Sequence, residues 1–111
     1  MNEIWDVVNS LAKKLDSHFQ QSDELRWTVQ ALKLQEEAGE VAEAVIGALG
    51  ANPRKGYSHD WDDVRKETCD VALSALVMLA RMGGDPRWFF EEHVRAVAER
   101  TIAAVPAGDH E

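Results

Sequence analysis

Proline and glycine divide this chain into four segments, and each segment has a helical pattern of apolar residues. The prolines occupy positions 53, 86 and 106, with Gly50 and the pair Gly83-Gly84 close by. Proline interrupts a helix interior, and glycine favours the residue after a helix. Asp85 before Pro86 is typical of a helix start. Because apolar residues recur at three- and four-residue spacings, the pattern predicts helices over about 3–20, 23–49, 60–82 and 86–104.

The length of 111 residues is that of one domain, and we see no repeat or linker. Four helices with short connections predict an all-α bundle over residues 1–111, with a frayed tail at 105–111. A chain of this size buries only about 60–70% of its unfolded surface. A homo-oligomer would therefore help to complete the core.

The charge balance is acidic: 12 Lys and Arg against 20 Asp and Glu give 12 − 20 = −8. Such a chain is a poor candidate for nucleic-acid binding, which depends on cationic contacts. One cysteine excludes a disulfide framework, and the acidic N-terminus does not resemble a signal peptide. The longest uncharged apolar run, Val71–Ala80, is half the length of a membrane helix. We expect a cytoplasmic protein that binds neither nucleic acid nor membrane.

An acidic stripe runs along the second segment. Glu36, Glu40 and Glu43 fall on one side of the expected helix, and Glu37 lies on the flank of this stripe. Like charges at this spacing disfavour an isolated helix, and no lysine is interleaved with them. Taken alone, this stripe fits a solvated outer face and a functional face equally well.

The third segment favours the functional interpretation. Glu67 and Asp70 share one face and come directly before the run Val71–Ala80, which is apolar around most of the helix and is expected to be buried. A buried carboxylate is costly unless it is paired or binds a cation. Two helices that present acid pairs to each other fit Mg²⁺, which prefers oxygen ligands. The alternative is an ion-pair network with one or more of the basic residues Arg54, Arg65, Lys66 and Arg81.

The ligand types narrow the choice of metal. Di-iron helical bundles use Glu-x-x-His on facing helices, and this spacing is absent from the chain. All-oxygen ligation favours Mg²⁺, with Mn²⁺ as a substitute.

The acids also resemble a family motif. The small MazG-like nucleotide pyrophosphohydrolases, which are all-α, carry Glu-Glu-x-x-Glu followed after a gap by Glu-x-x-Asp. Here Glu36-Glu37-Ala38-Gly39-Glu40 is followed by Glu67-Thr68-Cys69-Asp70. The resemblance covers roughly residues 25–82, and includes Lys33 and the 52–56 loop. It implies a four-helix MazG-like bundle completed by dimerisation, as a homodimer or a dimer of dimers.

The resemblance implies Mg²⁺-dependent hydrolysis of a nucleoside triphosphate, NTP or dNTP, to the monophosphate and pyrophosphate. By position it makes Glu37, Glu40, Glu67 and Asp70 the metal ligands, and Glu36 a residue that holds a further ion or orients the attacking water. These five acids are the expected catalytic set. A nucleotide-pool house-cleaning role is one possibility. A dimeric dUTPase-like enzyme, a phosphoribosyl-ATP pyrophosphohydrolase and a non-catalytic interaction module stay open as alternatives.

Basic and aromatic residues near these acids are candidate substrate contacts. Lys33 could reach a phosphate or pair with Glu37, and Arg54 and Lys55 could close over phosphates or form a plain surface turn. Trp61, at the start of the third segment, is the expected base contact. Arg81 completes this set, because a cation on a buried helix requires an anion.

Overall fold

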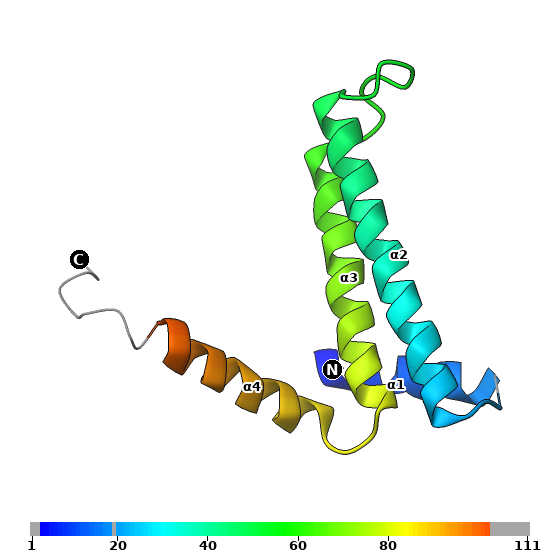
Figure 1. The fold of residues 1–111 in the computed structure, drawn as a ribbon, viewed down its shortest axis with the longest axis vertical. Coiled ribbons are helices and arrows are strands. Elements are labelled where there is room, and N and C mark those ends of the chain that lie inside the picture. Colours follow the sequence, from blue (N-terminus) through cyan, green and yellow to red (C-terminus); the bar gives the residue numbers. More distant parts are fainter. Residues whose placement is uncertain (1–2, 19, 103–111) are drawn as a thin grey trace.

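The computed structural model describes residues 3–18 and 20–102. Within these residues the chain forms four α-helices and no β-strand. The helices are α1 (Ile4–His18), α2 (Asp23–Leu49), α3 (Trp61–Arg81) and α4 (Pro86–Thr101), shown in Figure 1. The all-helical class and the four predicted helices are thereby confirmed, whereas the tail expected at 105–111 lies outside the described residues.

The helix ends follow local capping chemistry. Ser22 accepts a hydrogen bond from the backbone of Leu25 and starts α2, and Gly50 ends it with a left-handed φ of 64°. Asp60 and Asp63 form a reciprocal capping box at the start of α3. Asp85 accepts from the backbone N–H of Trp88 at the start of α4. These contacts satisfy backbone groups that have no partner within the helix.

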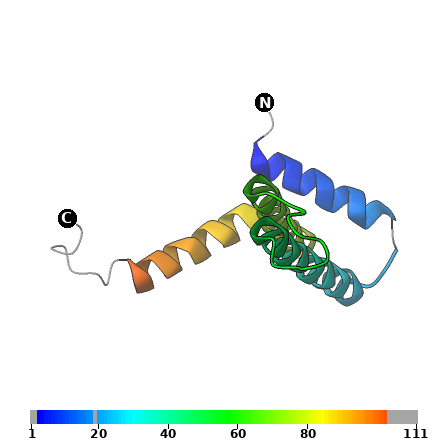
Figure 2. The ribbon, with the colours of Figure 1, turned by 90° about the horizontal axis from the view of Figure 1, so that it is seen from above.

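The long helices α2 and α3 lie side by side and run in opposite directions, with the 51–60 loop joining them at one end (Figure 1). The shorter α1 crosses the other end of this pair, as Figure 2 shows from above. Val8 and Ala12 of α1 pack with Val77 of α3 in a small core, which partly buried residues such as Leu73 and Leu76 extend. The helix pair therefore has α1 on one side only.

The helix α4 extends away from the other three helices (Figures 1 and 2). It contains no buried residue. Its first turns contact α1 through the rings of Trp5 and Phe90, whose centroids are 6.1 Å apart, and Arg87 forms an ion pair with Glu3, directly before α1, at 2.9 Å. The single chain thus gathers three helices, and the fourth member of the expected bundle stands apart.

The run Val71–Ala80 is less buried than its composition suggests. Within this run only Ser74 and Val77 are buried, and Ala72 is exposed. The expectation of burial around the whole helix is wrong for the single chain, because α1 and α2 cover only part of the circumference of α3. None of the described helices combines the length and apolar character that a membrane span requires.

Candidate functional site at the α2–α3 interface

A row of polar residues follows the contact between α2 and α3. Its members repeat at seven-residue spacing, a spacing that keeps them on one helix face. They are Gln30 and Glu37 on α2, and Glu67, Ser74 and Arg81 on α3. Because the helices are antiparallel, Arg81 lies beside Gln30 at one end of the interface, and Glu67 lies among the acids of α2 toward the other.

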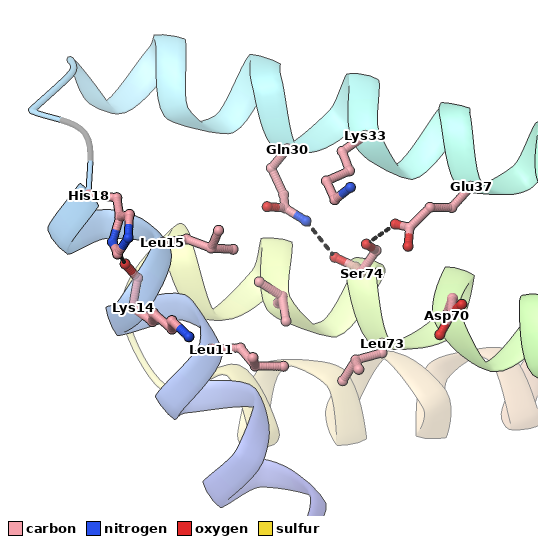
Figure 3. A pocket seen from close by; sticks show the side chains of 11 residues that line it. Leu11, Lys14, Leu15, His18, Gln30, Lys33, Glu37, Asp70, Leu73 and Ser74 are labelled. Atoms are coloured by element: carbon pink, nitrogen blue, oxygen red, sulfur yellow. Dashed lines mark hydrogen bonds between the residues drawn. The ribbon is translucent and has the colours of Figure 1, made fainter.

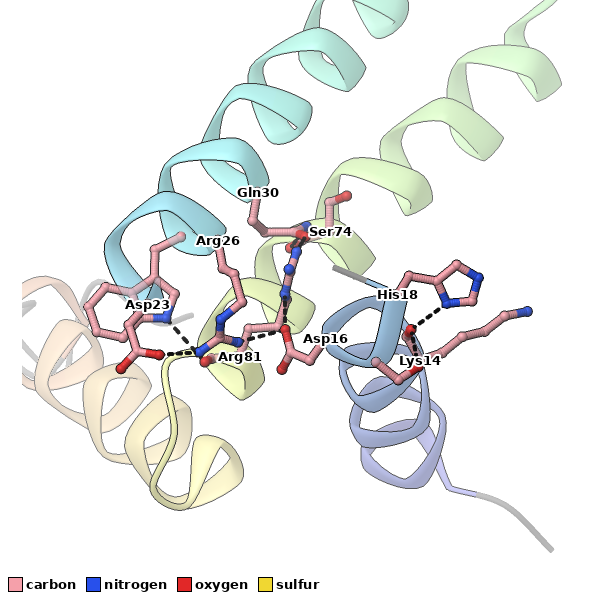
Figure 4. Close-up of polar contacts among 10 residues, drawn as sticks. Lys14, Asp16, His18, Asp23, Arg26, Gln30, Ser74 and Arg81 are labelled. Carbon is pink, nitrogen blue, oxygen red and sulfur yellow. Dashed lines mark hydrogen bonds and ion pairs between the residues drawn. The ribbon is translucent and has the colours of Figure 1, made fainter. Parts of the chain in front are cut away.

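At the end of the α2–α3 interface near α1, acidic and basic side chains form a network of ion pairs (Figure 4). The Arg81 side chain is buried, and its Nε lies 2.9 Å from Asp16 Oδ1, while its Nη1 lies 2.6 Å from Gln30 Oε1. Arg26 Nη1 approaches the same Asp16 oxygen at 2.6 Å. Trp27 Nε1 donates to the backbone oxygen of Arg81 at 3.1 Å. These contacts join α1, α2 and α3.

Asp16 keeps its negative charge in this network. Burial alone would raise the pKa of Asp16, but hydrogen bonds from Arg26 and Arg81, together with their positive charges, hold this pKa below its usual value of 3.8. The two arginines therefore stabilise the ionised carboxylate, and the carboxylate compensates the buried charge of Arg81.

The middle of the interface is a chain of hydrogen bonds (Figure 3). Gln30 Nε2 donates to the backbone oxygen of Ser74 at 3.2 Å. The Ser74 hydroxyl donates to Glu37 Oε1. Glu37 is half-buried, and this hydroxyl bond orients its carboxylate between the two helices. The bond gives one oxygen of Glu37 a donor.

Beyond Glu37 the interface brings acid against acid. The pKa of Glu40 is raised above its usual value of 4.5, first by a hydrogen bond shared with the Glu67 carboxyl, then by burial, then by repulsion from Glu67, Glu36 and Glu37. Glu67 Oε2 is buried and has no hydrogen-bond partner. A buried carboxylate oxygen without a donor is costly. Among the described residues, no basic side chain forms a salt bridge with Glu40 or Glu67, whereas Glu36 lies 3.9 Å from Lys33.

An open pocket of about 360 Å³ adjoins the acids on the side of α1 (Figure 3). Leu11, Leu15, Leu73 and Val77 give it an apolar floor. Its polar lining residues are Lys14, His18, Gln30, Lys33, Glu37, Asp70 and Ser74. The pocket thus combines an apolar floor, basic groups and two of the predicted metal ligands, an arrangement that suits a small ligand with an apolar part and a charged part.

The acids predicted to bind metal come together in part. Glu40, which is exposed, faces the half-buried Glu67, and Glu37 and the exposed Asp70 line the same pocket. Glu36 is exposed, and its Oε1 lies 3.9 Å from Lys33 Nζ. The structure therefore sorts the five acids into a facing pair, two pocket residues and one surface residue.

The remaining predicted substrate contacts are less closely grouped. Arg54 and Lys55 are exposed in the 51–60 loop, where the backbone N–H groups of both donate to Asn52 Oδ1 at 2.9 and 3.4 Å. Lys55 lines a different pocket, beside Glu43 and Gly47. The Trp61 side chain is 55% exposed at the start of α3. The single chain does not bring these three residues to the pocket that Glu37 and Asp70 line.

The sequence predicts that the buried cation Arg81 pairs with an anion, and this anion is Asp16 of the same chain rather than a substrate phosphate. The Arg81 guanidinium contacts Asp16 and Gln30, and the side chain of Arg81 is 6% exposed. A contact of Arg81 with substrate stays a prediction; the structure assigns the residue a bracing position between three helices.

The fit of a metal ion can be judged from the donors in place. Among residues 3–18 and 20–102, no three His, Cys, Asp or Glu side chains lie close enough together to hold a metal ion. In favour of a cation are the partnerless Glu67 oxygen and the acid that faces it, both of which supply the oxygen ligands that Mg²⁺ prefers. The donor type fits Mg²⁺, but the side chains of the described residues do not form a closed ligand set.

The sequence analysis did not predict the roles of several residues in this interface. Ser74 is the only polar residue in the run Val71–Ala80, a signal that it contacts another polar group. The seven-residue spacing of Gln30 and Glu37 also places them on one face. The pairing of Asp16 with Arg26 and Arg81 had no such signal, since it depends on how α1 crosses the other helices.

Comparisons with protein-family models, curated proteins and solved structures find no match to this chain.

Proposed function

We propose that this protein is a Mg²⁺-dependent nucleoside triphosphate pyrophosphohydrolase, which converts an NTP or dNTP to the monophosphate and pyrophosphate. The observation that carries the proposal is the facing pair Glu40 and Glu67, with a buried Glu67 oxygen that has no donor. A site with excess negative charge is suited to a cation and, through it, to an anionic substrate. The five-acid motif described above supports the same reaction class.

Glu37, Glu40, Glu67 and Asp70 would hold the metal ion in this proposal. A bound Mg²⁺ would neutralise phosphate oxygens and lower the pKa of a coordinated water. Glu36, which is exposed beside Lys33, would accept a proton from the attacking water. Ser74 would orient the Glu37 carboxylate through its hydroxyl.

The pocket beside the acids would receive the nucleoside. Its apolar floor suits the faces of a base, and Lys14 and Lys33 provide positive charge at a site where acids otherwise dominate. Arg54, Lys55 and Trp61 would join the site only through a change in the 51–60 loop or through a second copy of the chain, as the expected homodimer or dimer of dimers allows.

The test is a screen of NTPs and dNTPs with Mg²⁺ and Mn²⁺ that measures pyrophosphate release. We expect pyrophosphate and a monophosphate from at least one nucleotide, no turnover with chelator, and loss of turnover in Glu40→Gln. Glu43→Gln is the matched control, because Glu43 lies three residues further along α2 and lines another pocket. Release of inorganic phosphate with a diphosphate, or no divalent-dependent turnover of any nucleotide, would contradict the proposal.

A non-catalytic interaction module is the second candidate. It is favoured by the absence of a closed three-acid cluster in the described residues and by the bare apolar surface of α4. This candidate predicts that Mg²⁺ leaves the melting temperature unchanged. A rise in melting temperature that depends on Glu67 would exclude it.

A further inference from the structure

Gln30 of α2 is the most deeply buried polar residue in the part of the chain that the structure describes, with 2% of its surface exposed. Both ends of its side-chain amide have partners on α3. The amide oxygen accepts a hydrogen bond from Arg81 Nη1 at 2.6 Å, and the amide nitrogen donates to the backbone oxygen of Ser74 at 3.2 Å. Gln30 therefore joins α2 to α3 at two points.

The two partners explain why an amide occupies this position. A guanidinium only donates hydrogen bonds, and a backbone carbonyl only accepts them. Gln30 must therefore present an acceptor to Arg81 and a donor to Ser74, and a side-chain amide carries both. A glutamate here would keep the acceptor and lose the donor, whereas a methionine of similar length would lose both amide groups.

Ser74 is held by α2 on two sides (Figure 3). Gln30 binds its backbone oxygen, and the carboxylate of Glu37 accepts from its hydroxyl. Gln30 and Glu37 are seven residues apart, which corresponds to about 10.5 Å along a helix. Because Ser74 lies between these two partners, sliding α3 along α2 in either direction lengthens one of the two bonds. The two bonds together fix the register of the helices.

This register determines how the acids of the two helices face each other, since Glu37 and Glu40 belong to α2, and Glu67 and Asp70 to α3. Mg²⁺ requires near-octahedral ligands at about 2.0–2.1 Å, whereas Ca²⁺ accepts less regular ligands at about 2.3–2.6 Å. A shift of about 1 Å between the helices would therefore disfavour Mg²⁺ more than Ca²⁺.

We infer that Gln30 is a positioning residue, which locks the register of α2 against α3 and thereby makes the acids of the two helices selective for Mg²⁺ over Ca²⁺. A single buried polar residue can fix the register of packed helices in this way. The identity of the ion rests on the proposed function, whereas the register is a property of the chain without any ligand. Gln30 acts on the ion through Ser74 and Glu37.

The first test measures the register without metal. Spin labels on Cys69 of α3, the one cysteine of the chain, and on a cysteine that replaces Thr28 of α2 report the distance between the helices in chelator; both positions are exposed. We expect a narrow distance distribution with Gln30 in place and a shifted or broader one in Gln30→Met. Gln35→Met is the matched control, because Gln35 is exposed on the same helix, and it should leave the distribution unchanged.

The second test measures ion selectivity. The melting temperature is titrated with Mg²⁺ and with Ca²⁺, in the absence of nucleotide because Gln30 also lines the pocket beside the acids. We expect Gln30→Met to lower the apparent affinity for Mg²⁺ at least about tenfold and that for Ca²⁺ less, so that the ratio of the two affinities falls. Gln35→Met should keep this ratio. A substitution that only destabilises the fold would lower the melting temperature in chelator and leave the ratio unchanged.

Gln30→Glu replaces Gln30→Met in both tests if circular dichroism shows that the latter loses helix. Its carboxylate keeps an acceptor for Arg81 and has no donor for Ser74, so the fold should be retained while the register is released.

The inference is overturned by a distance distribution that Gln30→Met leaves unchanged, by equal changes in Gln30→Met and Gln35→Met, or by an affinity ratio that stays at the wild-type value. Its failure is distinguishable from failure of the proposed function. A wild type that releases pyrophosphate with Mg²⁺, while Gln30→Met keeps the register, rejects only the positioning role. A wild type without divalent-dependent turnover, in which Gln30→Met changes both the distribution and the ratio, rejects only the enzyme. A wild type that binds neither ion rejects both.

Discussion

The two ends of the α2–α3 interface use carboxylates in opposite ways. Near α1, Asp16 contacts two arginines, and its pKa is held below the usual value by them. Further along, Glu40 faces Glu67, and its pKa is raised. Opposite charges in the first region hold three helices together, whereas like charges in the second leave a buried oxygen without a partner. The difference separates an acid whose charge is compensated by arginines from a pair of acids that repel each other.

The largest expected effect is on turnover. Glu67→Gln removes a proposed metal ligand, so pyrophosphate release should fall at least about 100-fold. The apo protein should be as stable as the wild type or more stable, because a neutral amide replaces a carboxylate that faces another acid. Steady-state kinetics and thermal melting in chelator measure the two quantities. Full turnover in Glu67→Gln would show that the Glu40–Glu67 region is no more important for catalysis than the Asp16 network.

The balanced region should respond in stability instead. Asp16→Ala leaves the buried guanidinium of Arg81 without its anion, so we expect a loss of about 2 kcal/mol, less than for a fully buried pair because Asp16 is one-third exposed. Urea unfolding measures this loss. Asp62→Ala is the matched control, since the ion pair of Asp62 with Lys66 is exposed and should contribute under about 0.5 kcal/mol. Equal losses in both variants would contradict the assignment.

A smaller effect is expected from Mg²⁺ itself. At ten times its dissociation constant, a ligand that binds only the folded state stabilises it by about 1.4 kcal/mol. The melting temperature of the wild type should therefore rise with Mg²⁺, and that of Glu67→Gln should not. An equal rise in both proteins would place the ion elsewhere.

The smallest effect is on the acid side of the stability profile. Because the pKa of Asp16 is lowered in the folded state, its stabilising contribution is complete above the unfolded value of 3.8 and is lost as pH falls through the folded value. Asp16→Asn should flatten this part of the profile, measured as urea midpoint against pH. A wild-type midpoint that is constant below pH 3.8 would argue against the network.

The sequence predicted the parts of the fold that depend on local chemistry. Helix periodicity, Ser22, Gly50 and Asp85 locate the helix ends within a few residues. Helical spacing also indicated which acids share a face, and the structure brings Glu40 of α2 near Glu67 of α3, whereas their role as metal ligands stays a prediction.

The features that the sequence did not predict depend on how the helices are placed relative to one another. Nothing local indicates that α1 brings Asp16 to Arg81, or that α4 leaves the other helices. The wrong expectation of burial for Val71–Ala80 has the same cause. An apolar circumference indicates that a helix can be buried on all sides, but one chain supplies neighbouring helices for only part of the circumference of α3.

The direction of α4 depends on two residues that have no side chain. A β-carbon at Gly83 or Gly84 would meet no atom within 4 Å, so space does not restrict these positions, whereas their backbone angles do. The handedness of the backbone therefore decides which residues fit here. A D-alanine incorporated at position 84 by chemical ligation would preserve the course of the chain, whereas an L-alanine would change it. The direction of α4 relative to α3 would then follow from backbone handedness at this joint.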